Sequence, residues 1–162
     1  MRNLRLAALG EAPYAFASTV ERERDNSPEQ WRERLGWGTW FVAYVDDQPA
    51  GLVAGTSWPD EDPDRRHLIS MWVRPSHRGL GIAAQLIAAV RDWAADAGAH
   101  ELELWVADGN EAAVRTYASA GFVPTGRRQP LPSNPAVGEE LWVLAITTAH
   151  RAQPHEAAEN PG

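Results

Sequence analysis

A short stretch of arginine, glycine and small apolar residues could bind an anion. It reads Arg-Gly-Leu-Gly-Ile-Ala and occupies residues 78–83, where a helix is predicted to begin. Glycine lets the backbone approach a ligand closely, and the first amides of a helix have no acceptor inside it. Because these amides also lie at the positive end of the helix dipole, they suit phosphate. The stretch predicts a pyrophosphate site with Arg78 at its mouth.

The neighbouring elements should place this stretch at the edge of a sheet. Residues 68–73 form an apolar run that predicts a strand, and residues 81–97 carry an apolar stripe at helical spacing that ends before Gly98. Residues 101–106 alternate apolar and polar side chains, which predicts a second strand. This order predicts a right-handed parallel crossover with a crevice at the C-terminal ends of its strands.

The rest of the chain predicts a mixed α/β fold. Residues 3–35 read as two helical pieces, the second begun by Ser27-Pro28-Glu29-Gln30. Two short β-rich runs, 39–45 and 51–56, predict a hairpin. The remaining expected elements are a helix over 110–120 and strands over 122–126 and 139–146, the two strands flanking a proline-rich loop.

Composition excludes several kinds of chemistry. The chain has 162 residues, enough for one domain with a sizeable core, and a formal net charge of −7 that argues against non-specific nucleic-acid binding. All 15 basic residues are arginine, which excludes a Schiff-base lysine and a Walker-type phosphate loop. The absence of cysteine excludes a thiolate nucleophile, and the histidines show no metal-ligand spacing, so no metal is proposed.

Residues 1–149 are expected to form a single domain, and residues 150–162 read as a disordered tail because they have little to bury. Gly10, Glu11 and Pro13 interrupt the N-terminal apolar residues, so neither a signal peptide nor a membrane span is expected. We expect a cytoplasmic protein that binds neither nucleic acid nor membrane.

Two blocks of sequence together resemble the Gcn5-related N-acetyltransferase (GNAT) superfamily. Arg78-Gly79-Leu80-Gly81-Ile82-Ala83 is similar to the family's Gln/Arg-x-x-Gly-x-Gly/Ala turn. The second block, Leu104-Trp105-Val106 followed by Asn110, Ala113, Tyr117, Gly121 and Phe122, is similar to its Asn-x-x-Ala-x-x-x-Tyr-x-x-x-Gly-Phe. The resemblance is strong over residues 68–126 and looser over 4–57.

The resemblance implies acetyl-CoA as the donor and a small-molecule or peptide amine as the acceptor. By this likeness Tyr117 would direct its phenol at the thioester sulfur as the general acid, and Asn110 would touch the cofactor's arm. The backbone of Trp72 and Val73 would pair with the pantetheine. The pyrophosphate would be held by the Arg78 region and the amides of Gly79, Leu80, Gly81, Ile82 and Ala83. Because the chain has no cysteine, direct transfer in a ternary complex is favoured over a covalent intermediate.

One departure from the family concerns the first strand. The family usually opens with a strand before its first helix, whereas this sequence begins at helix-like residues. Either a shortened start omits that strand or the sheet lacks it, and in both cases an exposed sheet edge is expected. An exposed edge invites pairing, so a homodimer is a further expectation.

For several other side chains the sequence allows either a functional role or an ordinary structural one. Glu101, Glu103 and His67 are base candidates, although solvated strand carboxylates and an exposed loop histidine are the default. Acidic residues in the loop before the central strand suit a cationic acceptor or simply a solvated turn; they are Asp60, Glu61, Asp62 and Asp64. Four tryptophans suit an acceptor pocket or core packing; they are Trp37, Trp40, Trp58 and Trp72.

Two other functions remain open. Residues 79–84 also satisfy the dinucleotide fingerprint G-x-G-x-x-G/A, with Glu101 or Glu103 at a suitable distance for a ribose contact. In an NAD-dependent oxidoreductase, however, that turn follows its strand directly, and here residues 75–78 intervene. A non-catalytic acyl-CoA-binding or regulatory protein of the same fold is the second alternative, because a fold alone does not prove turnover.

Overall fold

The computed structural model describes residues 1–58 and 62–147. The predicted tail from residue 150, and Asp60 and Glu61 of the acidic loop, lie outside these described residues. No helix within the described ranges is long and apolar enough to cross a membrane.

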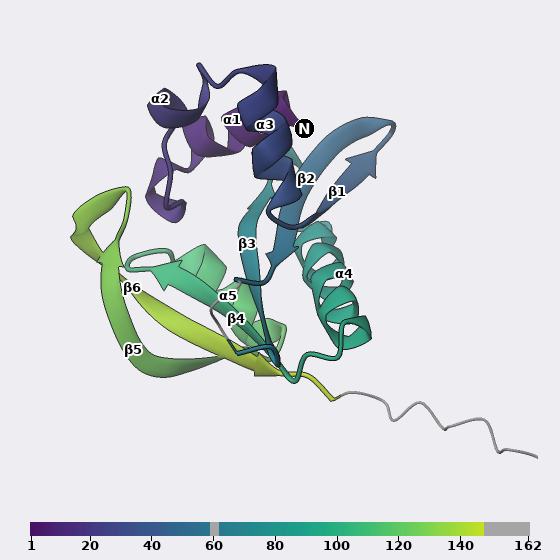
Figure 1. Ribbon diagram of the computed structural model, residues 1–162, viewed down its shortest axis with the longest axis vertical. Coiled ribbons are helices and arrows are strands. Elements are labelled where there is room, and N and C mark those ends of the chain that lie inside the picture. Colours follow the sequence, from purple (N-terminus) through teal and green to yellow (C-terminus); the bar gives the residue numbers. More distant parts are fainter. Residues whose placement is uncertain (59–61, 148–162) are drawn as a thin grey trace, which may run out of the picture.

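A six-stranded mixed sheet forms the centre of the molecule, which confirms the predicted α/β class (Figure 1). Its order is β1-β2-β3-β4-β6-β5, and β3 and β4 are parallel while the other neighbours are antiparallel. Among the described residues, β1 is an edge strand and pairs with β2 alone. The strands are β1 (Thr39–Val45), β2 (Gln48–Thr56), β3 (Arg65–Val73), β4 (Glu101–Ala107), β5 (Val123–Leu131) and β6 (Asn134–Ala145).

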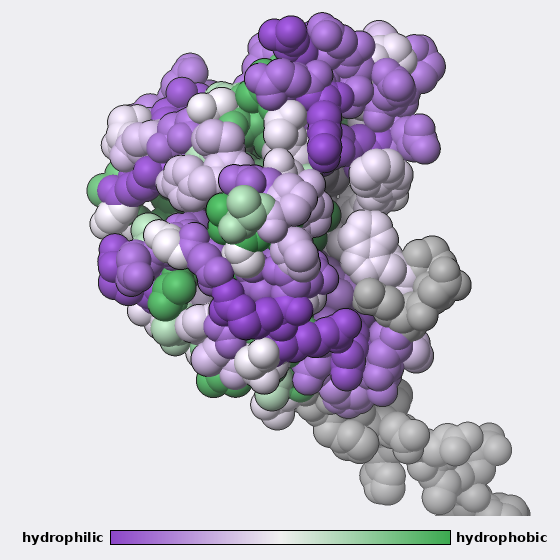
Figure 2. All heavy atoms as spheres, turned by 90° about the vertical axis from the view of Figure 1, so that its left-hand side faces the viewer, coloured by the Kyte–Doolittle hydropathy of each residue, from purple (hydrophilic) through white to green (hydrophobic). Residues whose placement is uncertain are grey.

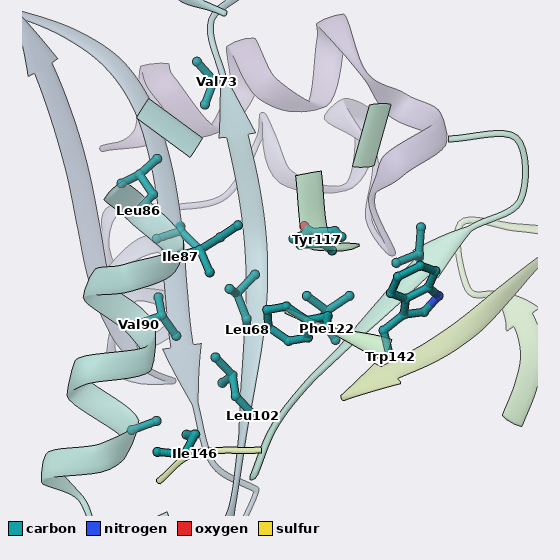
Figure 3. Packing of buried hydrophobic residues seen from close by; sticks show 14 of the residues in the cluster. Leu68, Val73, Leu86, Ile87, Val90, Leu102, Tyr117, Phe122, Trp142 and Ile146 are labelled. Atoms are coloured by element: carbon teal, nitrogen blue, oxygen red, sulfur yellow. The ribbon is translucent and has the colours of Figure 1, made fainter. Parts of the chain in front are cut away.

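Helices cover both faces of this sheet. Adjacent β2 residues show the division, since Leu52 packs with α1 (Arg2–Glu11) whereas Val53 packs with α4 (Ile82–Asp96). Figure 3 shows α4 residues in one apolar cluster with residues of β3 and β4. The remaining helical segments are η1 (Pro13–Ala15), α2 (Val20–Glu23), α3 (Pro28–Gly36), η2 (Pro75–His77) and α5 (Glu111–Ser119).

Local capping signals in the sequence are confirmed. Ser27 Oγ accepts from the Gln30 amide, and Gln30 Oε1 accepts from the Ser27 amide at 2.7 Å, so α3 begins with the expected capping box. The Asn110 side chain caps α5 by accepting from the Ala113 amide at 3.2 Å.

The prediction of a proline-rich loop before the last strand is wrong. Residues 123–131 and 134–145 instead form a long hairpin, β5 and β6. Pro124 and Pro130 are tolerated because β5 is an edge strand, and Pro135 lies in the part of β6 that precedes its pairing with β4. The side of the molecule on which β5 and β6 lie is mostly hydrophilic, with small separate apolar spots (Figure 2).

Candidate active site

The parallel strands β3 and β4 separate soon after they meet. Their pairing is limited to Arg65 with Glu101, Arg66 with Leu102, and His67 with Glu103. Farther along, side chains of both strands line a cleft of about 1400 Å³, which also reaches α4 and α5. The crevice expected between these strands is therefore present.

A bulge in β3 accompanies this separation. Its register with β2 runs from Leu52 opposite Trp72 to Ala54 opposite Ile69, so β3 contains one extra residue. Ser70 lies in this segment with a left-handed φ of 61°. A bulge bends its strand and increases the local twist, which directs the end of β3 away from β4.

The glycine turn follows the end of β3. Gly79 and Gly81 both have a φ of 77°, where an L side chain is strained. A Cβ at either position would meet no atom within 4 Å, so the backbone angle, not crowding, requires glycine there. Leu80, between them, is exposed to solvent.

Helix α4 presents its first amides at this turn. Gln85 donates to the Gly81 carbonyl at 3.2 Å, and the amides of Ile82, Ala83 and Ala84 precede this first intrahelical bond. These three residues and both turn glycines line the cleft, although the Ile82 side chain packs in the core. The turn therefore fits a pyrophosphate, and that contact stays a prediction.

Arg78 is already engaged by the protein. Its Nη2 donates to Glu11 Oε2 at 2.6 Å, and its Nε donates to the Val73 carbonyl at 3.0 Å. Burial raises the pKa of Glu11, but hydrogen bonds from Trp72 and Arg78 outweigh it and leave that pKa lowered. A phosphate would therefore share Arg78 with a carboxylate.

The backbone of Val73, rather than that of Trp72, faces the cleft. Arg74 donates its amide to the Ala50 carbonyl of β2 at 2.7 Å. Because consecutive strand residues point their backbone groups to opposite edges, the Val73 amide and carbonyl face away from β2 and those of Trp72 face toward it. Val73 is thus the better placed of the two to pair with an extended ligand, through its amide above all, because its carbonyl already accepts from Arg78 Nε.

Tyr117 combines a core position with access to the cleft. It is buried on α5 with its ring in an edge contact with Phe122, at 5.7 Å between centroids (Figure 3). Tyr117 also lines the cleft, as does Asn110. Burial raises the pKa of the Tyr117 phenol far above its ordinary value. A phenol that keeps its proton at neutral pH can act as an acid but not as a base.

Glu103 and His67 are buried, which corrects the expectation of solvated and loop positions. They are 5% and 7% exposed, because β3 begins at Arg65 and its parallel pairing sets His67 beside Glu103. His67 Nδ1 lies 3.8 Å from Glu103 Oε2, and Arg65 Nη1 lies 3.2 Å from Glu103 Oε1. Burial and the neighbouring Glu101 raise the pKa of Glu103.

A buried carboxylate on this cleft, Glu139, was not expected from the sequence. It accepts a hydrogen bond from Gln129 Nε2 at 2.7 Å, and burial raises its pKa. Its position depends on the register of β6 with β4, which sets it opposite Ala107. Nothing local in the sequence signals that pairing.

Two of the four tryptophans contradict the default of core packing. Trp37 and Trp58 are exposed and line the cleft. Trp72 is buried beneath α1, and Trp40 is half-buried against the same cluster. The rim of the cleft is therefore partly aromatic.

Comparison with known proteins agrees with this geometry. A family model described as the acetyltransferase (GNAT) family matches residues 6–122. The chain belongs to this family. A mycothiol acetyltransferase of Pseudarthrobacter chlorophenolicus is 30% identical over 105 residues, which are 65% of this chain and 28% of that protein. The chain spans between about a quarter and about half of the length of the first such curated relatives.

Solved structures of GNAT proteins share the fold. One, assigned to the family and from Desulfovibrio desulfuricans, has a TM-score of 0.71 at 17% identity, with 90% of this chain and 92% of that chain covered. Another, named as a streptothricin acetyltransferase from Bacillus anthracis, was solved in complex with acetyl coenzyme A. Its TM-score is 0.59 at 22% identity, with 67% and 62% of the two chains covered.

Proposed function

We propose that this GNAT domain transfers an acetyl group from acetyl-CoA directly to an amine. The observation that carries the proposal is the cleft between β3 and β4, which ends at the glycine turn and the free amides of α4. The family match and the acetyl-CoA complex of the B. anthracis protein support the same donor.

The chain supplies specific groups to each part of the donor. The amides from Gly79 to Ala83 would hold the diphosphate, and the cleft-facing backbone of Val73 would pair with the pantetheine arm. Asn110 lines the cleft at the start of α5 and would contact the same arm. When bound there, acetyl-CoA supplies a thioester as the acetyl source.

Tyr117 would act as the general acid. As the amine nitrogen bonds to the acetyl carbon, the phenol of Tyr117 gives its proton to the departing sulfur. The proton lost by the amine goes to a base, for which the buried pair of Glu103 and His67 is one candidate and Glu139 another. No cysteine is available to carry the acetyl group, so the proposal is transfer in a ternary complex.

The two alternatives are separated by experiment. Calorimetry with acetyl-CoA and with NAD should show binding of acetyl-CoA only, since the described sheet contains one parallel pair and η2 separates β3 from the turn. Release of free CoA thiol with a panel of amines should then distinguish a catalyst from an acyl-CoA sensor. Binding of NAD in place of acetyl-CoA, or acetyl-CoA binding without thiol release, would refute the proposed activity.

A further inference from the structure

Three charged residues form a buried cluster that the proposed chemistry does not use. Arg5 Nε and Nη2 donate to the two carboxylate oxygens of Glu23 at 3.1 and 2.9 Å. Arg34 Nη2 lies 2.8 Å from Glu23 Oε1. Two guanidinium groups thus share one carboxylate, which leaves one positive charge uncompensated within the cluster.

The uncompensated charge belongs mainly to Arg34. Each of the three guanidinium nitrogens of Arg5 has an acceptor, because Arg5 Nη1 also donates to Ser70 Oγ at 3.2 Å; the group also lies over the Phe16 ring. The buried Nε of Arg34 has no hydrogen-bond partner among the described residues. Burial and the adjacent Arg5 lower the pKa of Arg34, while Glu23 opposes this. Burying a guanidinium that lacks a full set of hydrogen-bond partners costs free energy, and an anion bound to it would offset that cost.

Arg34 is reachable from the cleft. Its side chain is 19% exposed and lines the cleft together with Arg5 and Trp37. Arg34 and Trp37 also form the wall of an adjoining pocket of about 280 Å³. The other charged residues of that pocket, besides Glu23, are Arg22 and Glu33, whose formal charges cancel.

The same cleft carries the opposite charge on another wall. Glu139 of β6 is buried and lines the cleft, on the sheet face where Trp105 also lies. Glu139 has an amide, Gln129, as its hydrogen-bond partner rather than a cation. A bound molecule therefore meets a cationic group at α3 and the Glu139 carboxylate at the sheet.

We propose that the acceptor amine also carries a carboxylate, as an amino acid does, and that Arg34, held by Glu23 and Arg5, binds that carboxylate. The inference rests on the proposed acetyl transfer and specifies its substrate class. A guanidinium matches the geometry of a carboxylate, and the pairing is strong when water is partly excluded. Arg34 also makes a cation–π contact with Trp37, with its guanidinium carbon 5.5 Å from the ring centroid.

The wild-type protein tests this through matched acceptors. Thiol release from acetyl-CoA is measured with the standard L-amino acids and with their decarboxylated counterparts, for example L-lysine against cadaverine and L-phenylalanine against phenethylamine. We expect at least one amino acid to exceed its counterpart about tenfold or more in kcat/KM. Equal or better turnover of the decarboxylated amines throughout would overturn the inference yet leave the acetyltransferase activity standing.

Failure of the proposed acetyl transfer and failure of the carboxylate site can be told apart. If acetyl-CoA does not bind at all, the proposed function fails first. If acetyl-CoA binds but no amine is turned over, calorimetry of the same panel with the CoA-loaded protein decides the matter, and the absence of amino-acid binding refutes the carboxylate site.

Variants of one helix locate the contact. Arg34→Gln should raise KM for the preferred amino acid about tenfold or more and leave KM for its decarboxylated counterpart and for acetyl-CoA unchanged. Arg34→Lys keeps the charge but loses the planar guanidinium, so its KM for the preferred amino acid should lie between those of the wild type and Arg34→Gln. Arg32→Gln is the control, because Arg32 lies on the same helix with its side chain 71% exposed and paired to Glu29. A rise in KM of equal size for both acceptors in Arg34→Gln, whose fold is checked by circular dichroism, would contradict the assignment.

Discussion

The Arg78 guanidinium donates to the Glu11 carboxylate at 2.6 Å, across 67 residues of sequence. The same Glu11 oxygen accepts from Trp72 Nε1 at 2.9 Å. One carboxylate therefore ties the end of α1 to the end of β3 and to the glycine turn. It also competes with any phosphate for the charge of Arg78.

This competition makes a paired prediction on acetyl-CoA affinity. Arg78→Ala should weaken binding about tenfold, or about 1.4 kcal/mol, if its charge meets phosphate. Glu11→Gln keeps an oxygen acceptor but removes the competing charge, so binding should tighten about two- to fivefold, a few tenths of a kcal/mol up to about 1 kcal/mol. Calorimetry measures both. Equal losses in the two variants would mean that the pair serves only to hold the turn.

The parts of the fold that the sequence predicted correctly depend on local signals. The capping box at Ser27, the Asn110 cap and the start of α4 at the glycine turn each follow from a few adjacent residues. Such signals act within one turn of chain, where side-chain type alone decides which backbone groups are satisfied. The motif of the resemblance lies in this category as well.

The parts that were missed depend on pairing between distant segments. The alternating pattern predicted Glu103 as a solvated strand residue. The three-residue pairing of β3 and β4 instead places His67 and Arg65 beside it. Glu139 reaches the cleft only through the register of β6. The cluster of Arg5 and Arg34 joins two helices through Glu23 of α2, a contact that no local pattern encodes.

The packing of α4 on β2 gives a prediction for stability. A Cβ at Gly55 would lie 2.5 Å from two Trp93 ring atoms, so Gly55→Ala should destabilise the fold by about 1–3 kcal/mol through overpacking. The control is Gly36→Ala, where a Cβ meets nothing and the residue ends α3. That change should stabilise by about 0.4–1 kcal/mol by restricting the unfolded chain. Urea unfolding compares them, and a neutral Gly55→Ala would contradict the close packing of Trp93.

Buried Glu139 predicts a pH-dependent effect. Burial raises its pKa in the folded state, so its stabilising contribution is present when it is protonated, below the unfolded value, and is lost as pH rises through the folded pKa. Glu139→Gln should therefore raise Tm at pH 7 by about 2–4 °C, and the advantage should vanish below a pH of about 4. The new amide can still accept from Gln129. Thermal unfolding of both proteins between pH 7 and about pH 4 measures the difference in Tm. If the variant kept its higher Tm in acid, the charge of Glu139 would not be the cause of the difference.

Tyr117 gives the sharpest test of the proposed mechanism. Tyr117→Phe keeps the ring that contacts Phe122 but removes the acidic proton, so kcat should fall about 10²-fold or more while acetyl-CoA affinity stays nearly unchanged. Tyr44→Phe is the matched control: Tyr44 is exposed on β1, so this variant should keep the wild-type kcat. Unaltered turnover in Tyr117→Phe would remove the phenol from the mechanism.

The pH profile of kcat provides an independent check on the same residue. Because burial raises the Tyr117 pKa, the phenol stays protonated above the ordinary tyrosine value of about 10, and it titrates only beyond that value. An acid that must be protonated therefore imposes no alkaline decline in kcat between about pH 8 and about pH 10. A decline in that range that is absent from Tyr117→Phe would show a phenol ionising far more easily than its buried position allows. A decline shared by both proteins would arise from another group.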